Sequence, residues 1–134
     1  MKYIIAFAFL VFTSTSCKKE GKTVIEPLPQ GTTLVSGNFT SSAHTTSGTA
    51  KIIRDDSNNL KLVFENFKTD NGPDLRVWMS SNTMANGYIE IGTLRAVAGN
   101  FSYDVGAQTD YTTNKNLLIW CEDAAVLFGY AVLQ

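Results

Sequence analysis

From residue 34 onward the chain alternates apolar and polar side chains, and this period-two pattern limits its fold more than any other feature. Apolar residues occupy every second position of 60–64 and of 75–79, and no sustained helical stripe competes with them. Turn-forming clusters of Gly, Asn, Asp and Ser separate the alternating runs. The pattern predicts strands over residues 34–40, 49–54, 60–66, 75–80, 88–94, 101–105, 117–122 and 125–133. We therefore expect an all-β protein, a single β-sandwich or barrel-like domain of about seven or eight short antiparallel strands.

The last two predicted strands are apolar on both faces, which is typical of central strands. A tight turn at 122–124 is expected to join them. Within the first of the two, Ile119 and Cys121 share one face, whereas Leu118 and Trp120 share the other. Cys121 ends its strand beside the turn, and the pattern leaves open whether it is buried or opens onto a rim.

The N-terminus resembles a bacterial lipoprotein signal. Lys2 is followed by an apolar run over 3–12, which is shorter than the roughly 20 residues that span a bilayer. Small residues then lead directly into Cys17, as in a lipobox, where the cysteine is acylated and becomes the new N-terminus. The alternative is an ordinary secretory signal with an incidental cysteine. Because Lys18 rather than Asp follows the cysteine, we expect lipid anchoring at the outer membrane of a bacterial cell envelope, on its periplasmic or surface face.

These features divide the chain into three parts. Residues 1–16 are the predicted lipoprotein signal peptide, and 17–33 are the lipidated Cys17 with a flexible tether rich in Lys, Pro and Gly. The remaining 34–134 are expected to form one domain.

Composition excludes several function classes. The 11 Lys and Arg nearly balance 12 Asp and Glu without forming a basic patch, so we expect no binding of nucleic acid. A single histidine, the absence of a CxxC pair and the absence of a glycine-rich phosphate loop remove most metal and nucleotide sites. The adjacent acids Asp55-Asp56 and Glu122-Asp123 are interpreted as solvated turn residues. We therefore do not expect a stand-alone enzyme.

Two residues remain as candidates for chemistry. If Cys17 is acylated, Cys121 is the only free thiol, and a thiolate can act as a redox centre or as a soft ligand to haem iron or copper. Equally, a free cysteine can be a small hydrophobe in the core. His44 lies in a polar loop, where it either has no role or, if the loop folds over the end of the sandwich, acts as an axial ligand or a base near Cys121.

As a set, these residues resemble the electron-transfer DM-thirteen domain family. The resemblance covers about residues 34–133 and is carried by the segments 37–39, 44–50, 60–67, 72–75, 91–94, 99–103, 119–121 and 128–133. It implies a small all-β domain that occurs on bacterial lipoproteins and beside dopamine-monooxygenase N-terminal-like domains. It also implies that Cys121 serves electron transfer, as a naked thiol or by holding a group such as haem, and that His44 matches the family's early histidine. The loop 104–116 departs from the family because it contains no proline.

Two further elements of the resemblance have a physical interpretation. Gly72, Pro73 and Asp74 form a structural turn motif, since proline fixes its backbone angle and an Asp side chain can bond the backbone. Trp120 either fills the second face of the sheet or stacks on a partner.

Three hypotheses follow for the function. The first is a membrane-anchored redox or electron-transfer domain that uses Cys121, with His44 as a second ligand and an envelope redox partner. The second is a non-catalytic module that recognises a glycan or protein through exposed aromatics such as Trp78, Tyr88 and Tyr111. In the third, Cys121 is inert packing in a structural envelope protein.

Overall fold

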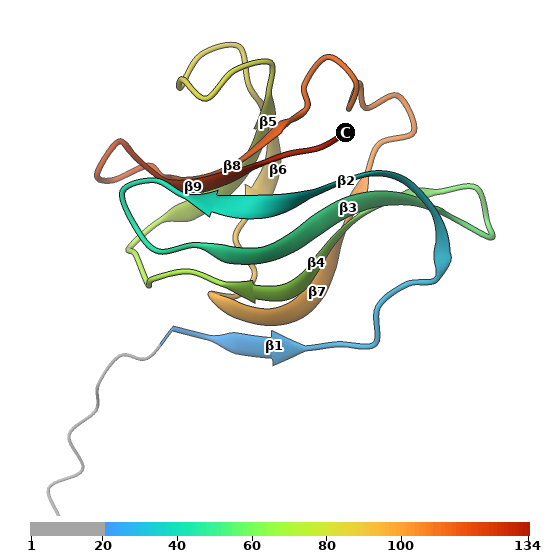
Figure 1. The fold of residues 1–134 in the computed structure, drawn as a ribbon, viewed down its shortest axis with the longest axis horizontal. Helices are drawn as coiled ribbons and strands as arrows, with labels where there is room; N and C mark the ends of the chain where they lie inside the picture. Colours follow the sequence, from blue (N-terminus) through green and yellow to red (C-terminus); the bar gives the residue numbers. More distant parts are fainter. Residues whose placement is uncertain (1–20) are drawn as a thin grey trace, which may run out of the picture.

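The computed structural model describes residues 21–134, so the predicted signal peptide and Cys17 lie outside the described residues. Nine strands run through the described part of the chain (Figure 1). They are β1 (Thr23–Ile25), β2 (Gly31–Ser41), β3 (Ser47–Asp55), β4 (Leu60–Lys68), β5 (Leu75–Ser80), β6 (Ile89–Thr93), β7 (Ala98–Val105), β8 (Asn116–Cys121) and β9 (Val126–Val132). No helix occurs between residues 21 and 134, and hence none that is long and apolar enough to cross a membrane.

The strands form one curled sheet in the order β1-β7-β4-β3-β2-β9-β8-β5-β6. Strand β2 joins its two halves, because its first part pairs with β3 and its last residues, Phe39–Ser41, pair with β9. The two halves consequently face each other across a common core (Figure 1). This confirms the expected all-β, barrel-like domain, with nine strands instead of seven or eight and with one parallel pair, β1 and β7.

The first strand corrects the predicted start of the fold. Residues 23–25 pair with β7, and the amide of Glu26 donates to the carbonyl oxygen of Asn100 at 2.9 Å. Gly99 permits this contact, since a Cβ there would lie 1.8 Å from the carbonyl oxygen of Val24. Because β2 also begins at Gly31, the sheet starts before Leu34, and strands cover residues 23–25 and 31–33 of the segment that was expected to be a flexible tether.

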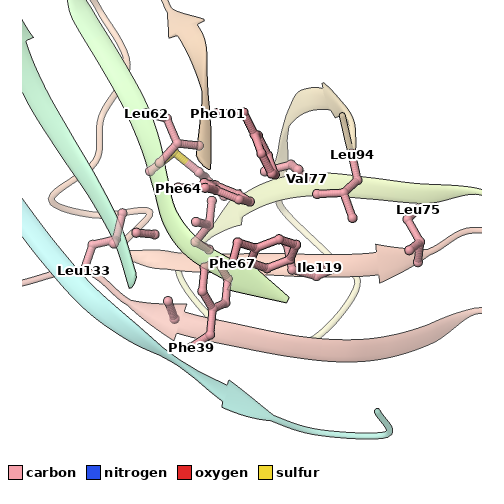
Figure 2. Packing of buried hydrophobic residues seen from close by; sticks show 14 of the residues in the cluster. Phe39, Leu62, Phe64, Phe67, Leu75, Val77, Leu94, Phe101, Ile119 and Leu133 are labelled. Atoms are coloured by element: carbon pink, nitrogen blue, oxygen red, sulfur yellow. The ribbon is translucent and has the colours of Figure 1, made fainter. Parts of the chain in front are cut away.

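Aromatic rings of β2, β4 and β7 form the centre of the core. Phe64 lies 5.0 Å from Phe67 and 5.0 Å from Phe101, measured between ring centroids, and 5.4 Å from Phe39. Apolar residues of β5 and β8 pack against this group from the opposite half, as Figure 2 shows for Val77 and Ile119. Burial of each such side chain is worth about 1.5–3 kcal/mol, so this cluster holds the curled sheet closed.

Candidate functional site

Cys121 is the last residue of β8 and lies on the inner face of the sheet. Its register partners are Leu75 of β5 and Val126 of β9, and it belongs to the same buried cluster as Ile119. It is a free cysteine and only 1% exposed. The structure thus answers the question that the sequence left open: the thiol is in the core at the end of its strand, and not on a rim.

The directions of the strands bring several loops together at the end of the sheet where β8 finishes. The register shows that β2, β4 and β6 finish at this end and that β3, β5, β7 and β9 start there. The connections 42–46, 69–74, 94–97 and 122–125 therefore lie at the same end as Cys121. We call these four connections the thiol-end loops. One of the two alternatives for His44 required its loop to lie at the end occupied by Cys121, and connection 42–46 does lie at this end.

His44 is held by contacts with two other elements. Its ring stacks on Phe128 at 3.8 Å between centroids, and its Nδ1 lies 2.8 Å from a carboxylate oxygen of Asp70. In the same loop, the buried hydroxyl of Thr46 lies 3.0 Å from that of Thr69, which ties connection 42–46 to connection 69–74. The imidazole is 38% exposed, so it sits at the surface of this end.

The turn of Gly72, Pro73 and Asp74 lies between Phe128, on which His44 stacks, and Leu75, the register partner of Cys121. A Cβ on Gly72 would lie 3.0 Å from Phe128 Cζ and 3.1 Å from Leu75 Cδ2, so the turn packs closely against both side chains. Leu75 is in turn paired with Cys121. Phe128, Gly72 and Leu75 thus connect His44 with the strand partner of Cys121, and within residues 21–134 no hydrogen bond joins the two candidates.

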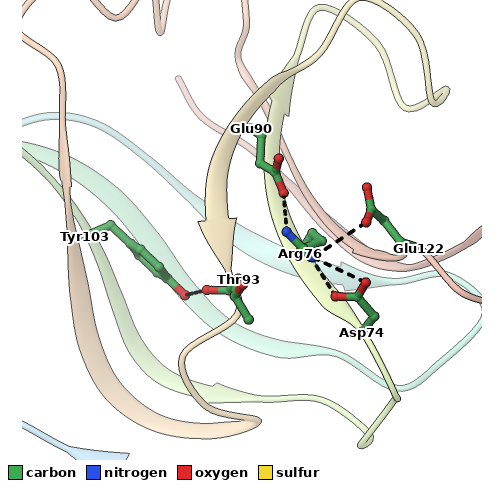
Figure 3. Close-up of polar contacts among 6 residues, drawn as sticks. All are labelled: Asp74, Arg76, Glu90, Thr93, Tyr103 and Glu122. Carbon is green, nitrogen blue, oxygen red and sulfur yellow. Dashed lines mark hydrogen bonds and ion pairs between the residues drawn. The ribbon is translucent and has the colours of Figure 1, made fainter.

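Asp74 binds a side chain and not the backbone that the sequence suggested. Arg76 Nε donates to Asp74 Oδ1 at 2.6 Å, and two further carboxylates surround the guanidinium (Figure 3). Glu90 lies 2.9 Å and Glu122 3.7 Å from its nitrogens. The hydrogen bond from Arg76 lowers the pKa of Asp74, and its acidic partners raise the pKa of Arg76. Glu122, interpreted from sequence as a solvated turn residue, is thus one of three carboxylates around one cation.

The outer face of β5 and β8 carries a stack of three aromatic rings. Trp78 lies 5.1 Å from Trp120 and 3.6 Å from Tyr88 between centroids, with interplanar angles of 18° and 6°. Trp120 therefore faces away from Cys121 and packs on the outer face of the sheet. Filling this second face was one of the two roles predicted for Trp120. The expectation that Trp78 is exposed is wrong, because the two flanking rings leave it 3% exposed. The ring of Trp78 is therefore not available as part of a flat aromatic surface that binds a glycan.

The residues of this end do not fit a haem. The pocket beside the thiol end, lined by 71–75, 93–97 and Lys22, measures about 180 Å³, less than the roughly 300–1,000 Å³ of ordinary small-molecule sites. It is lined by no His, Cys or Met. A second, more polar groove likewise offers none of these ligands; it is lined by residues 36–38, Thr40, Thr49, Val132 and Gln134. Within residues 21–134 no three His, Cys, Asp or Glu side chains are grouped to hold a metal ion.

Fold and site together define a small all-β domain with a buried free thiol at one end and aromatic rings on its outer face. The chain belongs to the Electron transfer DM13 family, whose model matches residues 38–133. The matched range includes Cys121 and His44 and leaves β1 outside. No curated protein and no solved structure matches the chain.

Proposed function

We propose that this chain is an exported, lipid-anchored electron-transfer protein whose redox-active group is the thiol of Cys121. Membership of the Electron transfer DM13 family supports a redox role in general. The observation that carries the assignment to Cys121 is that a free thiol ends a core strand among the thiol-end loops, while no described group of residues fits a metal or haem.

In this role the thiol loses one electron and its proton, R–SH → R–S• + H⁺ + e⁻. An oxidised partner of the envelope takes up the electron, and the proton passes to water at the exposed turn 122–125 next to Cys121. Burial keeps the sulfur away from a second thiol and from solvent, which prevents the disulfide and sulfenic acid products of exposed cysteines. The domain is accordingly an electron carrier and not an enzyme with a substrate pocket. His44 has no redox step in this proposal, because its contacts with Phe128 and Asp70 place it in support of connection 42–46.

The proposed anchor is Cys17, acylated and inserted in the outer membrane. Five residues lie between Cys17 and Thr23, and the six steps from one residue to the next span at most roughly 20 Å when extended. Strand β1 runs parallel to β7, so it starts at the end of the sheet that carries the thiol-end loops. An anchored chain would therefore keep Cys121 near the lipid surface and the opposite end of the sheet away from it. Fractionation tests the anchor: the natural chain should sediment with membranes, whereas Cys17→Ala should be released.

The redox role is tested by mixing the full chain, purified in detergent, with the strong one-electron oxidant hexachloroiridate(IV) under anaerobic conditions. The natural chain and Cys17→Ala should each reduce hexachloroiridate(IV) with a first phase of a single electron per chain, since both keep Cys121. The variants Cys121→Ser and Cys121→Ala should lack that phase. If either retains it at full amplitude, the thiol is not the redox group and the proposal is refuted.

A further inference from the structure

The three stacked rings on the outer face extend across three neighbouring strands. Trp120 belongs to β8, Trp78 to β5, and Tyr88 directly precedes β6, and these strands lie side by side (Figure 1). Trp78 pairs with Leu118 in register, so Trp120 is its diagonal neighbour, within reach of a large ring. The stack begins beside Cys121 and ends at Tyr88, which is 40% exposed in the loop at the opposite end of the sheet.

The covalent chain connects this stack with the thiol. Cys121 and Trp120 are consecutive residues of β8 whose side chains point to opposite faces, so one peptide unit joins the core thiol to the first ring. Electron tunnelling weakens steeply with distance, and successive contacts between oxidisable rings replace one long step by several short ones. The separations of 5.1 and 3.6 Å along the stack are contacts of this kind.

The charges around the first ring favour a positive charge on it. Arg76, with its three carboxylate partners, is the register partner of Trp120 on the same face. Three carboxylates exceed one guanidinium in charge, and their net negative potential lowers the energy of an oxidised indole nearby.

The middle ring has an unusual polar group. The indole N–H of Trp78 is buried and has no hydrogen-bond partner among the described residues. A buried, unpartnered donor costs stability, so its retention calls for an explanation. Without an acceptor, an oxidised Trp78 has nowhere to send its proton, and it therefore passes charge on by electron transfer alone.

From these contacts we propose that Trp120, Trp78 and Tyr88 form a relay that carries the electron of Cys121 to the surface at Tyr88. This inference rests on the proposed function of the thiol. A one-electron oxidant, such as an oxidised metal complex or a partner's metal centre, takes an electron at Tyr88. Electrons then move from Trp78 to Tyr88, from Trp120 to Trp78 and from Cys121 to Trp120. The net reaction leaves a reduced oxidant, the thiyl radical and a proton released to water at the exposed turn 122–125, and each ring returns to its original state.

The test fixes an oxidant at the exposed end of the relay. All samples are the full chain carrying Met84→His and His44→Gln, so that one ruthenium bipyridine photosensitiser coordinates the introduced imidazole. Met84 is 67% exposed and lies in the same loop as Tyr88. Flash excitation with hexaammineruthenium(III) as electron acceptor produces the oxidised photosensitiser, and loss of the thiol is then followed together with transient indole radical absorbance.

The relay predicts that Trp78→Phe slows thiol oxidation by about tenfold or more, because a phenyl ring is much harder to oxidise and raises the barrier. Near-ultraviolet circular dichroism and the urea midpoint of Trp78→Phe should match those of the parent chain, which separates loss of an oxidisable ring from damage to the fold. Tyr111→Phe, outside the stack, should leave the rate unchanged. Cys121→Ala should lengthen the life of the indole radical, since its electron donor is gone.

Two results would overturn the relay. One is an equal rate of thiol oxidation in Trp78→Phe and the parent chain. The other is an indole radical whose lifetime does not depend on Cys121. If hexachloroiridate(IV) still takes its electron from the thiol in solution, the relay alone fails; if the thiol is oxidised in neither experiment, the proposed function fails with it.

Discussion

Replacing Gly129 by alanine tests how the thiol-end loops are held on the sheet. Gly129 lies in β9, and a Cβ there would lie 2.5 Å from both Cβ and Oγ1 of Thr46 and 2.8 Å from the carbonyl oxygen of Thr40. These distances are shorter than real contacts of a Cβ atom. The carbonyl of Thr40 is backbone and cannot easily shift, so the side chain of Thr46 must move to make room. Its movement also breaks the buried hydroxyl contact with Thr69.

The expected cost of Gly129→Ala has two parts. Forcing an extra carbon into a packed site costs about 1–3 kcal/mol, and loss of a hydrogen bond costs about 1 kcal/mol more. The free energy of unfolding should therefore fall by roughly 2–4 kcal/mol, with a decrease in Tm of about 10 °C or more.

The assay is urea unfolding followed by tryptophan fluorescence, with Gly106→Ala as the matched control. A Cβ on Gly106 would meet nothing closer than 3.7 Å, at Thr109 Oγ1. That variant should remain within about 1 kcal/mol of the natural chain, on the stabilising side, because alanine restricts the unfolded state. Equal unfolding free energies for the two variants would refute the packing of Thr46 against β9.

Three further predictions concern other parts of the fold. Gly99→Ala should lower the free energy of unfolding by about 1–3 kcal/mol, because Gly99 has a φ of +122°. The new Cβ should also displace Val24 and abolish the protection of the β1 amides in hydrogen exchange. Burial raises the pKa of Tyr103 from 10.0 to about 12. The natural chain should therefore have a higher free energy of unfolding than Tyr103→Phe below pH 10.0, and this difference should be lost as the pH rises through about 12. Denaturation of both chains across that pH range measures the difference. Hydrogen bonds, first of all from the backbone N–H of Thr113, lower the pKa of Asp110 from 3.8 to about 2; Asp110→Ala should therefore destabilise the domain near neutral pH, with a difference that disappears between pH 3.8 and about 2.

The strands were predictable because their pattern is local. The alternation over 60–64 and 75–79 places apolar side chains inward, and the structure has strands over Leu60–Lys68 and Leu75–Ser80. Strand β1 was missed because it has only three residues and no alternating partner pattern. Its pairing depends on the close approach at Gly99, which is distant in the sequence.

The arrangement of the site was less accessible to sequence reasoning. That His44 and Cys121 lie at one end follows from the directions of the paired strands, whereas the sequence pattern offered this only as one of two alternatives for His44. The pairing of His44 with Asp70 and its stacking on Phe128 depend on how three separate loops meet, which periodicity does not encode.

The burial of Trp78 was missed for the same reason. Its position on the outer face suggested exposure, whereas β6 begins next to β5 and brings Tyr88 onto the indole. The alternation of residues along a strand assigns a side chain to a face but does not show which other residues cover that face.

Protein film voltammetry of the full chain is the most direct test of whether the thiol of Cys121 is the redox centre. If it is, we expect a one-electron wave in the natural chain and in Cys17→Ala, and no wave in Cys121→Ala at matched coverage and with native circular dichroism. A wave that survives in folded Cys121→Ala would contradict the claim that the buried thiol is the redox centre.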